Sequence, residues 1–196
     1  MEIESQVFEL DTRLMLGVKR GEDLCMDLLL NRHRRPVIQF LYRMVRNRAI
    51  AEELAQNVFL RVYRSRTSYE PTAKFTSWLF RIATRVALNS LRDRRHEASE
   101  LSLSASPERE MERQIPDRRP TVDQLLIRDA KLEEIRRAIA ELPGRQRAAV
   151  IMHKYEELEY GQIAVALNCS PQTVKSLLFR AYCSLRIRLA HMNGGC

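Results

Sequence analysis

Apolar residues recur every three or four positions through most of the chain, which is the period of a helix with one buried face. The clearest examples between residues 23 and 95 are Ile50, Leu54, Val58 and Val62, and then Leu79, Ile82, Val86 and Leu91. Pro71 follows a polar run at 65–70, and this break predicts a loop between two helices. The sequence has no strand-like alternation of polar and apolar residues and no internal repeat, so we expect an all-α fold.

The stretch 97–124 has a different character. It contains three prolines, no aromatic residue, and seven acidic residues against four basic ones. Such a segment buries little apolar surface and is typical of a mobile linker. Helical periodicity returns at Leu125 and is interrupted at Pro143 and Gly144. We therefore predict two small helical domains, 1–96 and 125–196, joined by a flexible linker at 97–124.

The segment 160–180 has the pattern of a helix-turn-helix. Its apolar positions fall where that motif buries side chains: Ile163, Leu167, Cys169, Val174 and Leu177. Ala164 is small enough for a close helix crossing, and Asn168 tolerates the left-handed turn. Ser170 is a good N-cap and Pro171 a good first helical residue. An ordinary helical hairpin with a polar surface explains fewer of these features together.

Positive charge is concentrated in both predicted domains. The chain has 33 Lys and Arg against 25 Asp and Glu, a net charge of +8. Residues 61–95 carry nine bases and two acids, and 170–190 carry Lys175, Arg180, Arg186 and Arg188 with no acid. One such cluster is often only a solvated helix face. Two clusters favour a nucleic acid held at two points.

Candidate catalytic and metal-binding residues are few. The six glycines are scattered and form no phosphate-binding loop, and the four histidines are isolated from carboxylate pairs. Cysteines 25, 169, 183 and 196 form no CxxC pair, which predicts free thiols rather than a zinc site that includes His191. We expect no catalytic residue, metal or cofactor, and so no enzyme acting on nucleic acid.

The chain shows no targeting segment. Its first five residues include two acids, where a secretory signal is basic, and no long apolar run follows. We expect a cytoplasmic protein that does not insert into a membrane.

Three groups of motifs, in order along the chain, resemble bacterial sigma factors. Ala51–Tyr63 resembles their polymerase-binding segment, and Phe75–Ala83 with Asn89–Arg92 resembles their promoter-melting helix. Leu142–Arg147, together with Thr173–Ser176 and Arg180–Ala181, resembles the domain that reads the upstream promoter element. Together these segments resemble the small, two-domain extracytoplasmic-function (ECF) group of the sigma-70 family.

The resemblance implies a non-enzymatic subunit that binds core RNA polymerase, directs it to specific promoters and helps to melt DNA. The residues implied to dock on the clamp helices of the largest polymerase subunit are Glu53, Gln56, Asn57 and Phe59. Those implied at the −10 element are Tyr69, Lys74, Phe75, Asn89, Arg92, Arg94 and Arg95. Those implied at the −35 element are Ser170, Gln172, Thr173, Lys175, Ser176, Phe179 and Arg180. An anti-sigma factor is a further implied partner.

Some positions have a second interpretation. Phe59 suits the core of the first domain as well as a docking surface, and Trp78 resembles a family position that is usually buried. Leu177 stands where many relatives carry arginine, which removes one DNA-contacting cation. A stand-alone helix-turn-helix regulator is the alternative function, against which only the docking and melting motifs speak.

Overall fold

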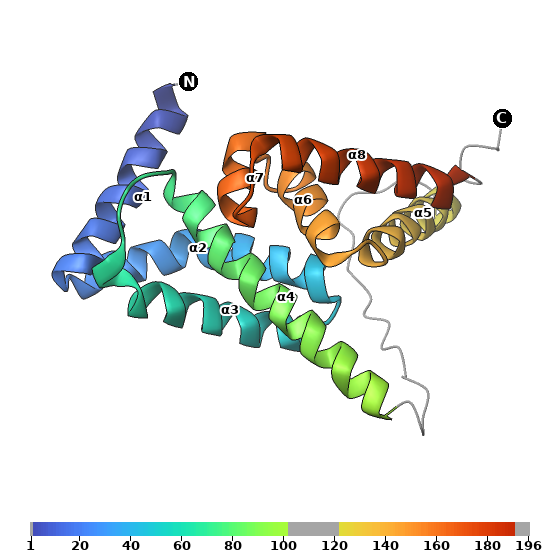
Figure 1. Ribbon diagram of the computed structural model, residues 1–196, viewed down its shortest axis with the longest axis horizontal. Coiled ribbons are helices and arrows are strands. Elements are labelled where there is room, and N and C mark those ends of the chain that lie inside the picture. The colour runs from blue at the N-terminus through green and yellow to red at the C-terminus, as the bar shows by residue number, and fades with distance from the viewer. Residues whose placement is uncertain (1, 102–121, 191–196) are drawn as a thin grey trace.

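The computed structural model describes residues 2–101 and 122–190, with side chains placed for 10–96 and 130–190. Within these ranges the chain is helical and contains no strand (Figure 1). The first domain comprises α1 (Glu2–Arg20), α2 (Asp23–Val45), α3 (Arg48–Arg64), the short 3-10 helix η1 (Arg66–Ser68) and α4 (Phe75–Leu101). The second comprises α5 (Val122–Ala140), α6 (Gly144–Lys154), α7 (Tyr160–Leu167) and α8 (Pro171–Arg188). The predicted all-α, two-domain fold is confirmed.

Helix α1 is an element that the sequence analysis missed, since it placed the first helical block after residue 23. Its buried face includes Leu14, Met15 and Val18, and it packs along α2. The turn between the two helices needs glycine at Gly21, whose φ is +91°. At Gly17 an added Cβ would lie 2.5 Å from the Cys25 sulfur, so only glycine allows this close crossing.

The second domain contains the predicted helix-turn-helix. Asn168 ends α7 with φ 50° and ψ 59°, the left-handed conformation expected for the turn. The Ser170 side chain then accepts a hydrogen bond from the Thr173 backbone N–H at 3.2 Å and caps α8. Ile163 and Val174 are fully buried where α7 packs on α8. Local turn and cap chemistry therefore specifies this motif.

The ends of the predicted linker are helical. Helix α4 continues to Leu101 and α5 begins at Val122, so these helices extend into the stretch 97–124. The intervening residues 102–121 lie outside the described part of the chain.

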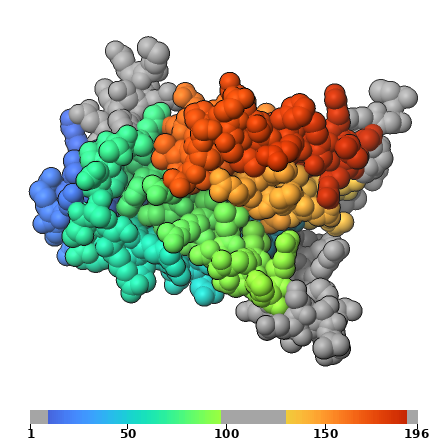
Figure 2. All heavy atoms as spheres, in the orientation of Figure 1, coloured from blue at the N-terminus to red at the C-terminus, as the bar shows by residue number. Residues whose placement is uncertain are grey.

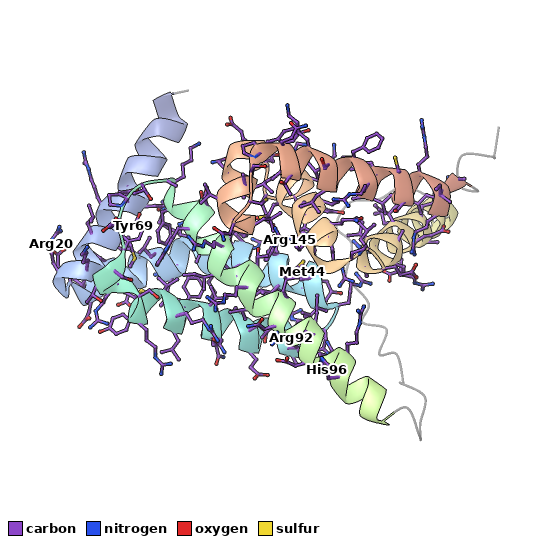
Figure 3. All side chains as sticks on the ribbon, in the orientation of Figure 1. Arg20, Met44, Tyr69, Arg92, His96 and Arg145 are labelled. Carbon is purple, nitrogen blue, oxygen red and sulfur yellow. The ribbon has the colours of Figure 1, made fainter. Side chains whose placement is uncertain are left out.

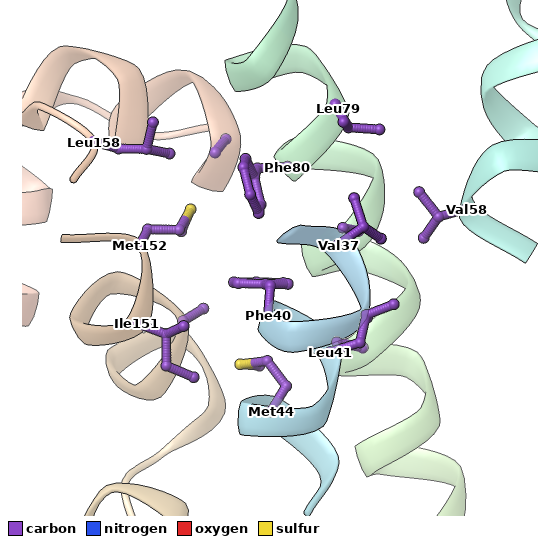
Figure 4. Close-up of a cluster of buried hydrophobic side chains, with 14 of the residues drawn as sticks. Val37, Phe40, Leu41, Met44, Val58, Leu79, Phe80, Ile151, Met152 and Leu158 are labelled. Atoms are coloured by element: carbon purple, nitrogen blue, oxygen red, sulfur yellow. The ribbon is translucent and has the colours of Figure 1, made fainter. Parts of the chain in front are cut away.

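The two domains share one apolar core. Helix α4 packs on α7, and α2 packs on α5 and α6. Phe40 of α2 and Phe80 of α4 lie edge to face at 5.2 Å, and both approach Met152 of α6 (Figure 4). The sequence suggested domains separated by a tether. The structure joins them instead, through side chains that are distant in sequence.

A half-buried guanidinium strengthens this junction. Arg147 of α6 donates hydrogen bonds to the carbonyl oxygens of Met44 at 2.5 Å and Leu142 at 3.3 Å, and to that of Ala140. These carbonyls lie at or just beyond the C-terminal ends of α2 and α5, where backbone acceptors lack helical partners. One side chain therefore satisfies acceptors from both domains.

A carboxyl group is buried beside the same junction. Glu156 lies 3.6 Å from Arg43 of α2, too far for a strong hydrogen bond. The Arg43 guanidinium also stacks over the Tyr155 ring, 4.3 Å from its centre. Burial raises the pKa of Glu156 to about 7, against the weaker opposing attraction of Arg43.

This pKa predicts how stability depends on pH. The folded protein keeps a proton on Glu156 up to about pH 7, whereas the unfolded chain releases it around the usual pKa of 4.5. This group's contribution to stability therefore falls as pH rises between these values. Glu156→Gln should remove that fall and stabilise the protein at pH 8 by about 1–3 kcal/mol.

Urea unfolding at pH 5 and pH 8 tests this expectation. The exposed neighbour Glu157 gives the matched control, Glu157→Gln, which should retain the wild-type pH dependence. An unchanged loss of stability between the two pH values in Glu156→Gln would contradict the assignment.

Candidate functional site

The N-terminal half of α8 presents a mixed polar and aromatic surface. The side chains of Val174, Leu177 and Leu178 are buried, and those between them point outward. The exposed set is Gln172, Thr173, Lys175, Ser176, Phe179 and Arg180. Phe179 is 70% exposed, although a ring of this size is normally covered in the free protein. In Figure 2 the atoms of α8 form part of the outer surface of the second domain.

Four of these residues line a shallow depression: Lys175, Ser176, Phe179 and Arg180. The Ser176 hydroxyl donates to the Gln172 carbonyl at 3.1 Å, and Arg180 Nε donates to the Ser176 carbonyl at 3.2 Å. Among the described residues, no carboxylate forms an ion pair with Lys175 or Arg180. Both cations are therefore available to an anionic partner.

Helix α3 presents a second exposed face. Glu53, Gln56 and Asn57 all lie on the surface as predicted, and Asn57 accepts a hydrogen bond from Arg61 Nε at 2.6 Å. Phe59 is only 6% exposed and belongs to the buried core. The interpretation of Phe59 as core is therefore correct for this structure, and its ring is not displayed for docking.

The apolar group on this face of α3 is one that the sequence analysis missed. Leu60 is 47% exposed and Tyr63 is 38% exposed. Both continue the row that starts at Glu53 and Gln56, because positions 53, 56, 60 and 63 lie on one side of a helix. Helical spacing from the predicted docking residues was the signal that could have identified them.

Two aromatic residues predicted to meet DNA are instead buried. Tyr69 and Phe75 are each 1% exposed. With Trp78 they form a cluster whose ring centres are 5.0 to 6.3 Å apart. In this conformation neither Tyr69 nor Phe75 offers a ring face to a base. The pair anchors the two ends of a loop, residues 70–74, in which Lys74 is exposed as predicted.

Helix α4 carries the predicted cations on its surface. Arg92, Arg94 and Arg95 are exposed and Asn89 is half-buried. In Figure 3, Arg92 lies toward the C-terminal end of α4, away from Tyr69. Arg81 and Arg85 are also exposed, and their spacing places them on the same side as Arg92. These two arginines are not among the predicted site residues.

Other kinds of site lack support in the described residues. They contain no group of three or more His, Cys, Asp or Glu side chains that could hold a metal ion. Cys25, Cys169 and Cys183 are free thiols, while His191 and Cys196 lie outside the described range. Within the described residues, no helix has the length and apolar character needed to cross a membrane.

Comparison with known proteins matches both halves of the chain. Residues 29–97 match the family Sigma-70 region 2, and residues 132–182 match Sigma-70, region 4. RNA polymerase sigma factor CarQ of Myxococcus xanthus is 34% identical over 171 residues, covering 84% of this chain and 88% of CarQ. ECF RNA polymerase sigma factor SigW of Bacillus subtilis is 28% identical, covering 88% and 92%.

A solved structure has the same fold. Sigma factor RpoE from Bartonella quintana, determined in complex with the anti-sigma factor NepR, superposes with a TM-score of 0.65 at 21% identity. The match covers 84% of this chain and 96% of that one.

The region 2 match contains the α3 face, the 70–74 loop and the α4 arginines, and the region 4 match contains the helix-turn-helix. A stand-alone helix-turn-helix regulator does not account for the first of these matches. The chain therefore belongs to the extracytoplasmic-function group of the sigma-70 family and is an RNA polymerase sigma factor, which directs the polymerase to promoters.

Proposed function

We propose that three separate surfaces carry this function. The exposed face of α3 docks on core RNA polymerase, the 70–74 loop with the α4 arginines holds the opened −10 strand, and α8 reads the −35 element. The observation that carries the proposal is the surface of α8, where a 70% exposed Phe179 stands beside Lys175 and Arg180, which form no ion pair with a carboxylate among the described residues. The chemistry of RNA synthesis belongs to the polymerase, so this chain acts without catalytic residues or cofactors.

The α8 surface suits a major groove. Gln172, Thr173 and Ser176 supply amide and hydroxyl groups for base edges, and the ring of Phe179 suits a thymine methyl group. Lys175 and Arg180 have no described carboxylate partner and can approach phosphates on either side. Ser170 caps the helix, so its contribution is to fix where α8 begins.

The α3 surface suits a protein partner. Interfaces are commonly organised as an apolar anchor within a polar rim. Leu60 and Tyr63 supply the apolar area, and Glu53, Gln56 and Asn57 supply the rim. Arg66 stacks over Tyr63 at 4.1 Å, which orients that ring.

The loop and α4 suit a single strand. An unpaired strand is held by cations along its backbone and by groups that meet the exposed bases. Lys74, Arg92, Arg94 and Arg95 supply the cations. Tyr69 and Phe75, whose rings are buried, anchor the two ends of the loop.

We further propose a cytoplasmic location, where bacterial RNA polymerase works, and an anti-sigma factor as a regulatory partner. The resemblance to the ECF group supports the anti-sigma factor. The RpoE structure was determined with such a partner, and its similarity to this chain concerns the fold.

Polymerase docking should depend on Leu60 more than on Phe59. Leu60→Ala, alone or with Gln56→Ala, should weaken binding to core polymerase by roughly tenfold or more without unfolding the protein. Phe59→Ala should instead lower the free energy of unfolding by about 3–5 kcal/mol. Fluorescence anisotropy with labelled protein measures binding, and circular dichroism measures folding.

Leu24, which is 77% exposed at the start of α2, provides the matched control. Leu24→Ala should bind core polymerase like the wild type. Normal binding by a folded Leu60→Ala, Gln56→Ala double variant would show that docking lies elsewhere.

Promoter choice should depend on α8 in two separable ways. Ser176→Ala and Phe179→Ala should change the ranking among −35 sequences, because each specific base contact is worth about 1–3 kcal/mol. Lys175→Ala and Arg180→Ala should weaken binding to all sequences alike. Each should lower the salt dependence of binding by roughly one charge. Titration of holoenzyme onto promoter variants at several salt concentrations separates the two effects.

The two roles would be reversed if Phe179→Ala weakened binding to every sequence equally and Arg180→Ala altered the ranking among sequences. No effect from any of the four changes would exclude α8 as the recognition helix.

A further inference from the structure

Helix α1 lies outside the segment that matches Sigma-70 region 2, which begins at residue 29. It nevertheless contacts both η1 and α4, the two elements on either side of the 70–74 loop. In Figure 1 the connection between η1 and α4 runs beside α1. Helix α1 is therefore placed to hold both ends of this loop.

The first contact holds the start of the loop. The Lys19 ammonium group donates a hydrogen bond to the Tyr69 carbonyl oxygen at 2.9 Å. The Tyr69 side chain is only 1% exposed, and burial raises the pKa of its phenol. Helix α1 thus holds the backbone of Tyr69 directly, at the point where the loop begins.

The second contact holds the end of the loop through one intermediate residue. Asp11 of α1 is only 2% exposed. Its carboxylate accepts a hydrogen bond from Arg32 Nε at 2.7 Å and lies 2.9 Å from His33 Nε2. The His33 ring packs on Phe75, with ring centres 5.3 Å apart.

The Asp11 carboxylate is ionised in this setting. Burial acts to raise the pKa of Asp11, but His33 and Arg32 together hold it below its usual value. A buried charge with two partners fixes their orientation strongly, because removal of either partner leaves a desolvated charge. His33 is therefore a rigid support under Phe75.

We propose that α1 is a positioning element for promoter opening: Lys19 fixes the start of the 70–74 loop and the Asp11–His33 pair fixes its end. The inference rests on the proposed role of this loop at the −10 strand. Fixing both ends reduces the conformational freedom that the loop loses when it binds a strand, and this preorganisation strengthens binding. Lys19 and Asp11 themselves act through the loop and need no contact with DNA.

The test uses holoenzyme made with the full chain and Lys19→Met, which keeps the aliphatic stem but removes the donor. Binding is measured to a single-stranded −10 oligonucleotide and to duplex −35 DNA, and opening is followed with a fluorescent base analogue. Arg20→Met is the matched control, since Arg20 pairs with Glu22 rather than with the loop. Lys19→Arg keeps a donor and tests rescue.

Lys19→Met should weaken strand binding and slow opening by roughly three- to tenfold, as expected for loss of a charged hydrogen bond. Binding to duplex −35 DNA and to core polymerase should not change. Arg20→Met should behave like the wild type, and Lys19→Arg should recover most of the loss. Asp11→Asn should weaken strand binding in the same direction, with folding checked by circular dichroism.

The salt dependence of strand binding separates positioning from direct contact. A positioning role leaves the slope of log affinity against log salt unchanged, whereas loss of a phosphate contact reduces it by about 0.7 on single strands. A reduced slope in Lys19→Met would overturn the proposal, because Lys19 would then contact DNA itself.

Lys74→Ala separates failure of this inference from failure of the proposed function. If Lys74→Ala weakens strand binding and folded Lys19→Met does not, α1 does not position the loop. If neither change has an effect, the loop is not a DNA contact, and the proposed −10 role fails together with the inference. Weaker strand binding in both variants supports the −10 role of the loop and the positioning role of α1.

Discussion

Helix α2 buries a broad face along most of its length, and the arrangement of the other helices follows from the need to cover it. Leu29, Val37, Phe40, Leu41 and Met44 are all completely buried. These positions form one broad face that runs along the helix from Leu29 to Met44, and several neighbouring helices share in covering it. Helices α1, α3 and α4 cover part of α2, and α5 and α6 of the second domain cover the rest. Burial of one helix thus joins the two domains.

The functional surfaces occupy the faces that this core leaves outside. Helix α3 buries Val58 and Phe59 and exposes Leu60. Helix α8 buries Val174 and Leu177 and exposes Phe179. Each helix therefore contributes one face to stability and another to binding, so a substitution on the outer face can change function without unfolding the protein.

The parts of the fold that local chemistry determines could be predicted from the sequence. Asn168 and Ser170 mark the helix-turn-helix because the left-handed turn and the N-cap depend on a few adjacent residues. The exposed cations of α4 and α8 followed from charge and spacing. Leu60 was missed because Phe59, one position away, is the more obvious anchor, and only packing shows which of them faces the core.

Contacts between distant parts of the chain could not be predicted in this way. The roles of Tyr69 and Phe75 depend on α1 and α2, which supply Lys19 and His33. The contact of Arg147 with the Met44 carbonyl joins residues 103 positions apart. Periodicity indicates that a face is buried, but it does not identify what covers it.

The claim that α2 joins both domains into one folding unit can be tested by equilibrium unfolding. Trp78 is the only tryptophan and lies in the first domain, so its fluorescence reports on that domain, whereas far-ultraviolet circular dichroism reports on all the helices. A shared core predicts that the two signals change together over one range of urea concentration. Loss of the Trp78 signal at a urea concentration where a large part of the helical signal remains, or the reverse, would show that the domains unfold independently and would contradict this account.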